Sequence, residues 1–392
     1  MKISTKILFV VALSICAQSV RAIPFAFEGR SLGMGGVSVA TADLATAAWA
    51  NPAMLTNQRP SDDFSLLIGI GAFVRDDDEL LQDIDDFQAA DDRLQAATDA
   101  SDATGAVNAT QDMADIIRGI DGKDMAVNVS GVAAMGMAFD SFAMALSVRS
   151  DAIGAGTVTN LSQTPEELLN DPTKNILNLE GVVATEFGVS LAKDFRFFRK
   201  KVSLGIKPKV VDLQAFVFQE SIRTANGLND VFSDGQKADL GSFTSFDLGA
   251  AVDLTRSLRL GLNIRNLITD EFDLGNQTLN FDTSARIGLA YFNRLLTVAV
   301  DYDLIKNKPL LANPNFDNLK TQYLAVGAEF NAFDFAQLRI GARKNLASGI
   351  SDKAKDTALT AGVGFWLGFN LDVAATFSNN SIGAFVQTGF RF

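Results

Sequence analysis

The chain has 392 residues, a formal net charge of −12, no histidine and a single cysteine, Cys16. Without histidine the Ser-His-Asp and Cys-His catalytic sets are excluded, and the commonest zinc ligand is missing. An acidic chain is also a poor nucleic-acid binder because phosphate contacts need a basic face, and no cofactor or metal-binding motif is present.

The first 22 residues have the three parts of an export signal. Lys2 and Lys6 supply positive charge, residues 7–15 are apolar, and small or β-branched residues precede a cleavage point after Ala22. The apolar stretch is too short to span a bilayer as a helix, which needs ~20 residues. A lipoprotein anchor at Cys16 is the alternative, but Ile15 stands where a small residue is expected.

Residues 23–61 precede the first expected strand and predict a plug inside a barrel. The segment contains a glycine cluster, Gly33, Gly35 and Gly36, whose spacing and lack of a preceding strand exclude a dinucleotide-binding loop. A run of small residues at 40–50 and the triplet Asn51-Pro52-Ala53 follow. Small residues allow tight packing, which suits a segment lodged in a lumen.

Residues 62–392 resolve into about fourteen strands that alternate between an apolar face and a small or charged face. Counting back from Phe392 and Phe390, every second residue is apolar or threonine. Since no stretch of ~20 apolar residues exists, an exported chain that spans a membrane must close its sheet on itself. The predicted fold is all-β, a membrane-spanning antiparallel β-barrel. The strands start near residues 63, 125, 141, 181, 201, 242, 258, 282, 295, 321, 336, 357, 371 and 382.

The connections between these strands alternate in length, as in outer-membrane barrels with short periplasmic turns and long extracellular loops. An even strand number then leaves both ends of the sheet on the periplasmic side. The short connections are 139–140, 194–200, 254–257, 292–294, 332–335 and 368–370; the longer ones are 76–123, 151–180, 224–240, 268–281, 305–320 and 345–356, with a short last one at 379–381.

The first long connection, 76–123, predicts a helical hairpin over the extracellular mouth. An acidic run at 76–79 suits a helix N-terminus and lacks the ordered spacing of a Ca²⁺ loop. The apolar residues form either a packing face on the barrel rim or a landing site for a hydrophobic ligand. They are spaced as helical stripes: Leu80, Ile84, Phe87 and Leu94, then Met113, Ile116, Ile117 and Ile120.

Charged residues occur on the predicted lumen face in both signs. They form either a structural network of ion pairs around the plug or the lining of a polar channel. The candidates are Asp247, Asp253, Arg259, Arg265, Arg286, Asp301, Asp303, Glu329, Arg339 and Arg343.

Pro208 lies within a predicted strand, where it cannot donate to the ladder. Apolar residues are even-numbered before it, as at Leu204, and odd-numbered after it, as at Val211 and Leu213. That change of phase predicts a β-bulge at Pro208.

The N-terminal pattern resembles the hatch of the FadL-type outer-membrane transporters. The resemblance rests on residues 33–36, the alanine-rich residues 42–47 with their one aspartate, and residues 51–53. It implies fourteen strands, a hatch in the lumen, and passive carriage of long-chain fatty acids or other hydrophobic compounds. It also implies a kinked strand that opens sideways, which would place a lateral opening at Pro208 rather than a harmless bulge at the rim. PorV-type barrels of secretion systems share a similar pattern.

The acidic stretch Asp76 to Asp92, with residues 85–88 at its centre, is similar to a family of barrel proteins labelled conjugal-transfer TraF. This resemblance implies an alternative role as a structural or docking barrel of a conjugal or secretion apparatus. FadL-type transporters carry their ligand-binding helices in later loops than the one found here.

We therefore expect a transport protein of the Gram-negative outer membrane, and not an enzyme, because no nucleophile stands beside a recognisable base. The expected partners are outer-membrane lipid and lipopolysaccharide, the barrel assembly machinery reading Phe390 and Phe392, and a hydrophobic small molecule. No cofactor and no nucleic acid are expected.

Overall fold

The computed structural model describes residues 28–57, 63–76, 78–224, 236–273, 278–307, 311–312, 320–332, 335–349, 357–378 and 381–392. The predicted signal peptide, with its cleavage point near Ala22, lies outside the described residues. Residues 23–27 and 58–62 of the predicted hatch segment do so too.

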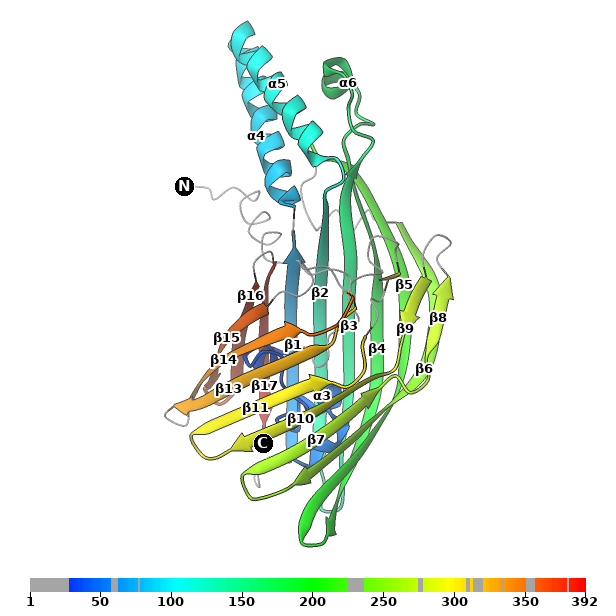
Figure 1. Ribbon diagram of the computed structural model, residues 1–392, viewed down its shortest axis with the longest axis vertical. Helices are drawn as coiled ribbons and strands as arrows, with labels where there is room; N and C mark the ends of the chain where they lie inside the picture. The colour runs from blue at the N-terminus through cyan, green and yellow to red at the C-terminus, as the bar shows by residue number, and fades with distance from the viewer. Residues whose placement is uncertain are drawn as a thin grey trace.

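Fourteen antiparallel strands form a closed barrel, as predicted, and each pairs with its neighbours in chain order (Figure 1). Twelve begin within two residues of the predicted starts, while β4 and β6 begin five and six residues earlier. The strands are β1 Phe64–Arg75, β2 Asp124–Ala138, β3 Ala143–Thr159, β4 Ile176–Phe197, β5 Lys200–Ser221, β6 Gln236–Asp253, β7 Leu258–Arg265, β10 Ser284–Phe292, β11 Leu296–Asp303, β13 Tyr323–Ala332, β14 Ala336–Asn345, β15 Thr357–Trp366, β16 Asn370–Ser378 and β17 Ser381–Arg391.

The first and last strands close the barrel. Their pairing runs from Ser65 opposite Arg391 to Arg75 opposite Ser381. The ring of Phe392 stacks on that of Phe64 with centroids 6.2 Å apart. Phe390 and Phe392 therefore lie where β17 meets β1, and their recognition by the barrel assembly machinery stays a prediction.

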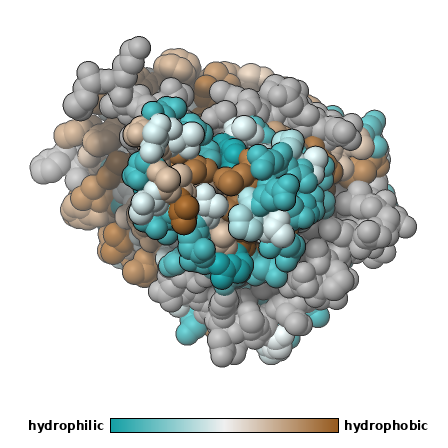
Figure 2. All heavy atoms as spheres, turned by 90° about the horizontal axis from the view of Figure 1, so that it is seen from above, coloured by the Kyte–Doolittle hydropathy of each residue, from teal (hydrophilic) through white to brown (hydrophobic). Residues whose placement is uncertain are grey.

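The outer wall is apolar because period-two alternation turns every second side chain outward. Ile70, Ile340 and Leu359 are 63%, 67% and 61% exposed. Seen from the helical end, hydrophilic side chains gather over the helices and hydrophobic ones gather on the flank (Figure 2). A wall with this much exposed apolar surface suits lipid rather than water. No helix in the described part of the chain is long and apolar enough to cross a membrane.

Strands β2 to β6 have 15 to 22 residues, whereas β7, β10, β11 and β13 to β17 have 8 to 11. The tall side stands out in Figure 1. The expected connection 151–180 is therefore too long, because β3 continues to Thr159 and β4 begins at Ile176. Gly154 and Gly156 occupy this part of β3, so the leucine alternation that marks the other strands is lost there.

The long connections contain structure that the sequence pattern did not predict. Three short strands form a separate sheet, in the order β12 Leu311–Ala312, β9 Thr278–Phe281 and β8 Asp270–Asp273. Helix α6, Pro165–Asn170, lies between β3 and β4. Its signal was present, because Thr164 accepts from the Glu167 amide and Pro165 follows at the first helical position.

Residues 76–123 hold the two expected helices, α4 Leu80–Asp99 and α5 Ala103–Ile120, which rise as a hairpin above the barrel (Figure 1). Their apolar stripes meet each other and the upper strands at Met125, Val158 and Leu177. The stripe is therefore a packing face. Leu80, Ile84, Phe87, Met113, Ile117 and Ile120 are buried, and Leu94 and Ile116 are partly buried.

Candidate functional site

Residues 28–57 lie inside the barrel and are called the plug here. The segment comprises α2 Gly29–Gly33, α3 Ala47–Ala50 and the 3-10 helix η1 Pro52–Thr56, which sit within the ring of strands (Figure 1). Met34, Ala47 and Leu55 are no more than 1% exposed. The assignment of this segment as a hatch remains a prediction.

The wall accepts the plug because glycines face it wherever the plug's main chain comes close. A Cβ at Gly327 would collide with the Met34 carbonyl, and one at Gly341 would collide with Gly35. We call these inner-wall residues the glycine seat. Its members are Gly136, Gly205, Gly249, Gly261, Gly288, Gly327, Gly341 and Gly362.

Six of these glycines stand directly opposite one another in neighbouring strands. The register pairs Gly205 with Gly249, Gly261 with Gly288, and Gly327 with Gly341. The sequence analysis missed the seat. The available signal was glycine inside a strand, which often marks the close approach of another backbone.

The glycines of the hatch motif meet this seat. Gly35 has φ +76°, and a Cβ there would lie 2.7 Å from the Val326 carbonyl oxygen. Its amide donates to Thr360 Oγ1 at 2.8 Å. Gly33 lies against Gly362, while Gly36 has φ +92° and open space around its Cα. Positive φ explains two of the three glycines and close approach explains the third.

The Asn51-Pro52-Ala53 triplet fixes the other end of the plug. Asn51 Oδ1 accepts from the Ala53 amide at 3.1 Å and caps η1. Asn51 Nδ2 donates to the Val39 carbonyl at 2.8 Å and to that of Ala250 at 3.2 Å. Pro52 and Ala53 lie against Gly205 and Gly249, so the wall recognises this turn by its shape.

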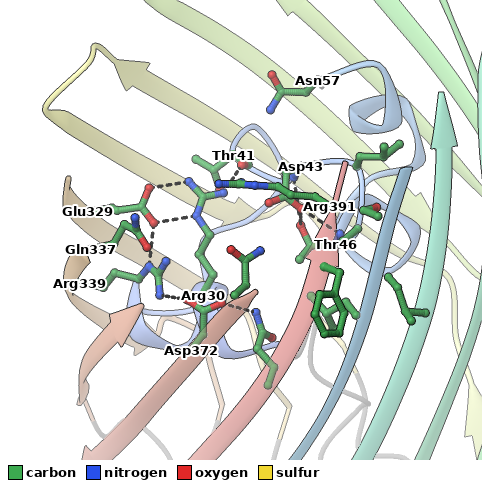
Figure 3. A pocket seen from close by; sticks show the side chains of 18 of the residues that line it. Arg30, Thr41, Asp43, Thr46, Asn57, Glu329, Gln337, Arg339, Asp372 and Arg391 are labelled. Carbon is green, nitrogen blue, oxygen red and sulfur yellow. Dashed lines mark hydrogen bonds and ion pairs between the residues drawn. The ribbon is translucent and has the colours of Figure 1, made fainter. Parts of the chain in front are cut away.

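A fork of ion pairs ties α2 to the short strands. Arg30 donates through Nε and Nη2 to the two oxygens of Glu329, at 2.8 and 2.9 Å. Arg339 donates to Glu329 at 2.7 Å and also pairs with Asp372 (Figure 3). Burial alone would lower the pKa of Arg30, but the Glu329 carboxylate outweighs that effect and raises it. Glu329 thus joins the plug to the wall.

Two further wall residues bind the plug's main chain. Asp301 Oδ2 accepts from the amides of Ser38 and Val39 at 2.8 and 3.0 Å. Arg286 donates to the Gly36 carbonyl at 3.3 Å while pairing with Asp303 at 2.5 Å. These predicted lumen charges are therefore structural contacts of the plug.

The remaining predicted lumen charges also have partners. Arg259 pairs with Asp253 at 2.6 Å, and the Arg343 guanidinium lies 5.4 Å from the centroid of the Tyr323 ring. One of these contacts is an ion pair and the other a cation–π contact, and the interpretation of the lumen charges as a structural network stays a prediction.

Glu28 caps α2 from within the lumen. Its carboxylate accepts from the amides of Ser31 and Arg30 at 2.7 and 2.8 Å. Burial, opposed by Arg30, raises the pKa of Glu28 to about 7. The plug therefore contains one carboxyl group that titrates near neutral pH.

A second charged layer lies above the plug on the long strands β4, β5 and β6 and on the neighbouring β7. Glu186 accepts from Lys207 at 2.5 Å and from Lys209 at 2.8 Å, and Lys209 also pairs with Asp247 at 2.8 Å. Arg265 completes the layer, 3.4 Å from Glu186. The sequence pattern predicted Asp247 and Arg265 as lumen charges but not Glu186, Lys207 or Lys209, and on β5 the change of phase after Pro208 obscured the two lysines.

The predicted bulge at Pro208 is wrong. Register with β6 is continuous from Lys207 opposite Asp247 to Pro208 opposite Phe246, and the shift occurs later, between Leu213 and Gln214. Apolar residues become odd-numbered after Pro208 because the inner wall itself turns apolar there.

That apolar inner wall lies between the charged layer and the mouth helices. Along β4 the inward residues are Val182 and Ala184 above Glu186, and Ala192 against the plug below. We call it the apolar layer. It consists of Ile153, Val182, Ala184, Val211, Leu213, Phe243 and Phe281.

Pro208 interrupts the ladder on its other side. Pairing of β4 with β5 stops at Gly188 opposite Lys209 and resumes at Leu191 opposite Ile206, since proline has no N–H to donate. On the outer face, this position lies in a groove of about 730 Å³. Apolar side chains from neighbouring strands line it, among them Leu66, Met135, Leu146, Val189 and Val210.

A smaller polar chamber of about 250 Å³ lies beside the plug (Figure 3). Asp43, Asn57, Gln337 and Arg391 line it together with Arg30. In the described ranges, no group of three or more Asp, Glu, His or Cys side chains is placed to hold a metal ion.

Comparison with known proteins places this architecture. Residues 48–303 match the family described as "F plasmid transfer operon, TraF, protein". No curated protein sequence matches the chain.

Solved structures share the fold at low identity. The Ralstonia pickettii toluene transporter TbuX has a TM-score of 0.55 and 14% identity, covering 94% of this chain and 99% of its own. The P. putida toluene transporter TodX has a TM-score of 0.56 and 14% identity, covering 94% of this chain and 99% of its own. A Pseudomonas aeruginosa FadL homologue has a TM-score of 0.56 and 12% identity, covering 95% of this chain and 99% of its own. None of these three names is that of an enzyme.

Proposed function

This chain belongs to the TraF family of the F plasmid transfer operon, and its barrel has the FadL-type fold. From that premise, we propose that it is a transport protein of the Gram-negative outer membrane for hydrophobic small molecules. The proposed cargo includes long-chain fatty acids, and passage is passive.

The groove at Pro208 carries this proposal. Three features come together there: an interrupted ladder, an apolar outer groove of about 730 Å³ and the nearby apolar layer. A hydrophobic solute gains nothing from a water-filled pore, because it would have to stay exposed to water. A lateral opening at Pro208 would instead release it into lipid.

The proposed route avoids the plug. A molecule that enters beside the mouth helices would meet the apolar layer, where Val211 and Leu213 face inward. The charged layer of Glu186, Lys207 and Lys209 lies below and disfavours further descent of an apolar solute. Pro208 lies at the height of this charged layer, so the solute would leave sideways through the proposed opening there.

The test is uptake by Pro208→Ala, which restores an N–H and lets the β4–β5 ladder close. With radiolabelled oleate and toluene as probes in proteoliposomes, we expect uptake to fall about tenfold, the effect of a loss of about 1.4 kcal/mol in passage. Pro165→Ala, at the first position of α6, is the matched control and should transport normally. Normal uptake by Pro208→Ala would overturn the lateral route.

The family description favours a second candidate, a structural or docking barrel of a conjugal-transfer apparatus. The close fit of plug and wall is compatible with a barrel that passes nothing. Purification in mild detergent separates the two proposals. Co-purified hydrophobic compounds support transport, whereas stoichiometric partner proteins on a ligand-free barrel support docking.

A further inference from the structure

The β4–β5 hairpin projects from the end of the barrel opposite the mouth helices (Figure 1). Strand β3 pairs with β4 only as far as Ala143 opposite Ala192, and β6 pairs with β5 only as far as Val252 opposite Val202. Residues Lys193–Phe197 therefore extend five positions past β3, which is about 17 Å of strand. We call residues 193–201 the basic hairpin.

The charge of the basic hairpin opposes that of the whole chain. It holds five Lys or Arg and one Asp, in a protein with a formal net charge of −12. Asp194 is already paired with Lys201 at 2.7 Å. The cations Arg196, Arg199 and Lys200 are exposed, so the tip presents a concentrated positive surface.

Three phenylalanines accompany these charges. Phe195, Phe197 and Phe198 are 47%, 64% and 85% exposed. Phe195 and Phe197 continue the outward face of β4 after Val189 and Leu191 on the apolar outer wall and after the exposed Lys193, whose ammonium lies 6.0 Å from the centroid of the Phe195 ring. The aromatic surface is thus an extension of the lipid-facing surface beyond the neighbouring strands.

The turn itself is held in an unfavourable conformation. Phe198 and Arg199 have φ values of +45° and +63°. A two-residue turn with positive φ at both positions prefers Asn-Gly, because bulky L-residues are strained there. A strained, exposed Phe-Arg pair points to a surface feature used in contact rather than to a turn optimised for stability.

We infer that the basic hairpin binds anionic phospholipid headgroups of the leaflet at its end of the barrel. Transmembrane barrels carry girdles of aromatic residues at both membrane interfaces, and each Lys or Arg near an anionic surface adds about a fivefold preference. An acidic protein would satisfy the charges but would not require an aromatic face continuous with the lipid-facing wall. Lipid satisfies both features.

The experiment is native mass spectrometry of the purified barrel in mild detergent with equal amounts of dioleoyl phosphatidylglycerol and phosphatidylcholine. The wild type should retain phosphatidylglycerol at least about fivefold over phosphatidylcholine. In Arg196→Gln/Arg199→Gln/Lys200→Gln the ratio should fall to within about twofold of unity. Heat-modifiable gel migration checks that each variant is a folded barrel.

The matched control removes three cations at the other end, as Arg93→Gln/Arg118→Gln/Lys174→Gln, and should keep the wild-type ratio. Phe197→Ser/Phe198→Ser should lower retention of both lipids without changing their ratio. An unchanged ratio in the hairpin variant, or an equal loss in the control, overturns the inference. A photo-crosslinker at Phe198 that captures an acidic protein, with the lipid ratio unchanged, also overturns it in favour of protein docking.

Discussion

The short barrel strands, β7, β10, β11 and β13 to β17, and the long strands, β2 to β6, differ in most of their contacts with the lumen contents. The short strands bind the plug through charged and polar side chains, notably Glu329, Asp301 and Thr360. On the long strands, small residues such as Ala145 and Ala192 pack against the plug, and the apolar layer and Pro208 lie above. We therefore expect substitutions on the short strands to loosen the plug. Substitutions on the long strands should affect stability or the proposed passage and leave the plug in place.

The largest effect is expected on the short strands, from Glu329→Ala. It leaves the guanidinium groups of Arg30 and Arg339 without their shared carboxylate, which should cost about 4 kcal/mol of unfolding free energy. The plug should also loosen and the barrel should conduct ions in planar bilayers. Asp253→Ala, whose partner Arg259 does not touch Glu329, should stay closed. A closed, fully stable Glu329→Ala barrel would contradict the division.

Leu213→Ala tests the long-strand side. The side chain is 0% exposed in the apolar layer, and the cavity left behind should cost about 3 kcal/mol in urea unfolding. Because Leu213 does not hold the plug, conductance should stay at the background level while stability falls. Leu213→Met serves as the volume-conserving control, and a conducting Leu213→Ala barrel would show that the two sides are not separable.

Gly327→Val tests the glycine seat. The added side chain would meet the Met34 carbonyl, and overpacking of this kind should cost about 2 kcal/mol and raise conductance. Gly131→Val is the matched control, since a Cβ at Gly131 meets nothing within 4 Å. Equal behaviour of the two variants would show that the seat does not hold the plug.

The last prediction, confined to one pH window, is a pH dependence centred on Glu28. Its pKa is raised from the ordinary 4.5 to about 7, so the folded protein holds the proton more tightly than the unfolded chain does. The contribution of Glu28 to stability should therefore be fully present below about pH 4.5 and should be lost as the pH rises to about 7. Glu28→Gln should remove this component, so the melting temperatures of the two proteins should diverge across that window and run parallel above it.

Local patterns predicted the wall and missed what the wall contacts. The alternation in β7 places Arg259 and Arg265 inward, as found, because lipid imposes a period of two on the outer face. Lys207 and Lys209 were missed because the inward residues after them, Val211 and Leu213, belong to the apolar layer, so the alternation seemed to change phase at Pro208. No local pattern reveals a partner distant in sequence.

The hatch motif shows the same boundary between local and distant information. The positive φ of Gly35 follows from its own residue type, whereas its fit against Gly341 depends on a strand some 300 residues later. The sequence therefore indicated that this segment is compact and contains glycines with an unusual backbone conformation. It could not indicate which wall positions must remain glycine.

The glycine seat also bears on how the protein is made. Residues 28–57 precede every strand of the barrel in the chain, and the seat fits their main chain near Gly33–Gly35, Val39, Leu44 and Asn51–Ala53. A sheet that closed without them would leave Glu329 and Asp301 without their plug partners. Docking of this segment and closure of the barrel are therefore thermodynamically coupled, since the plug supplies contacts to strands from both halves of the sheet.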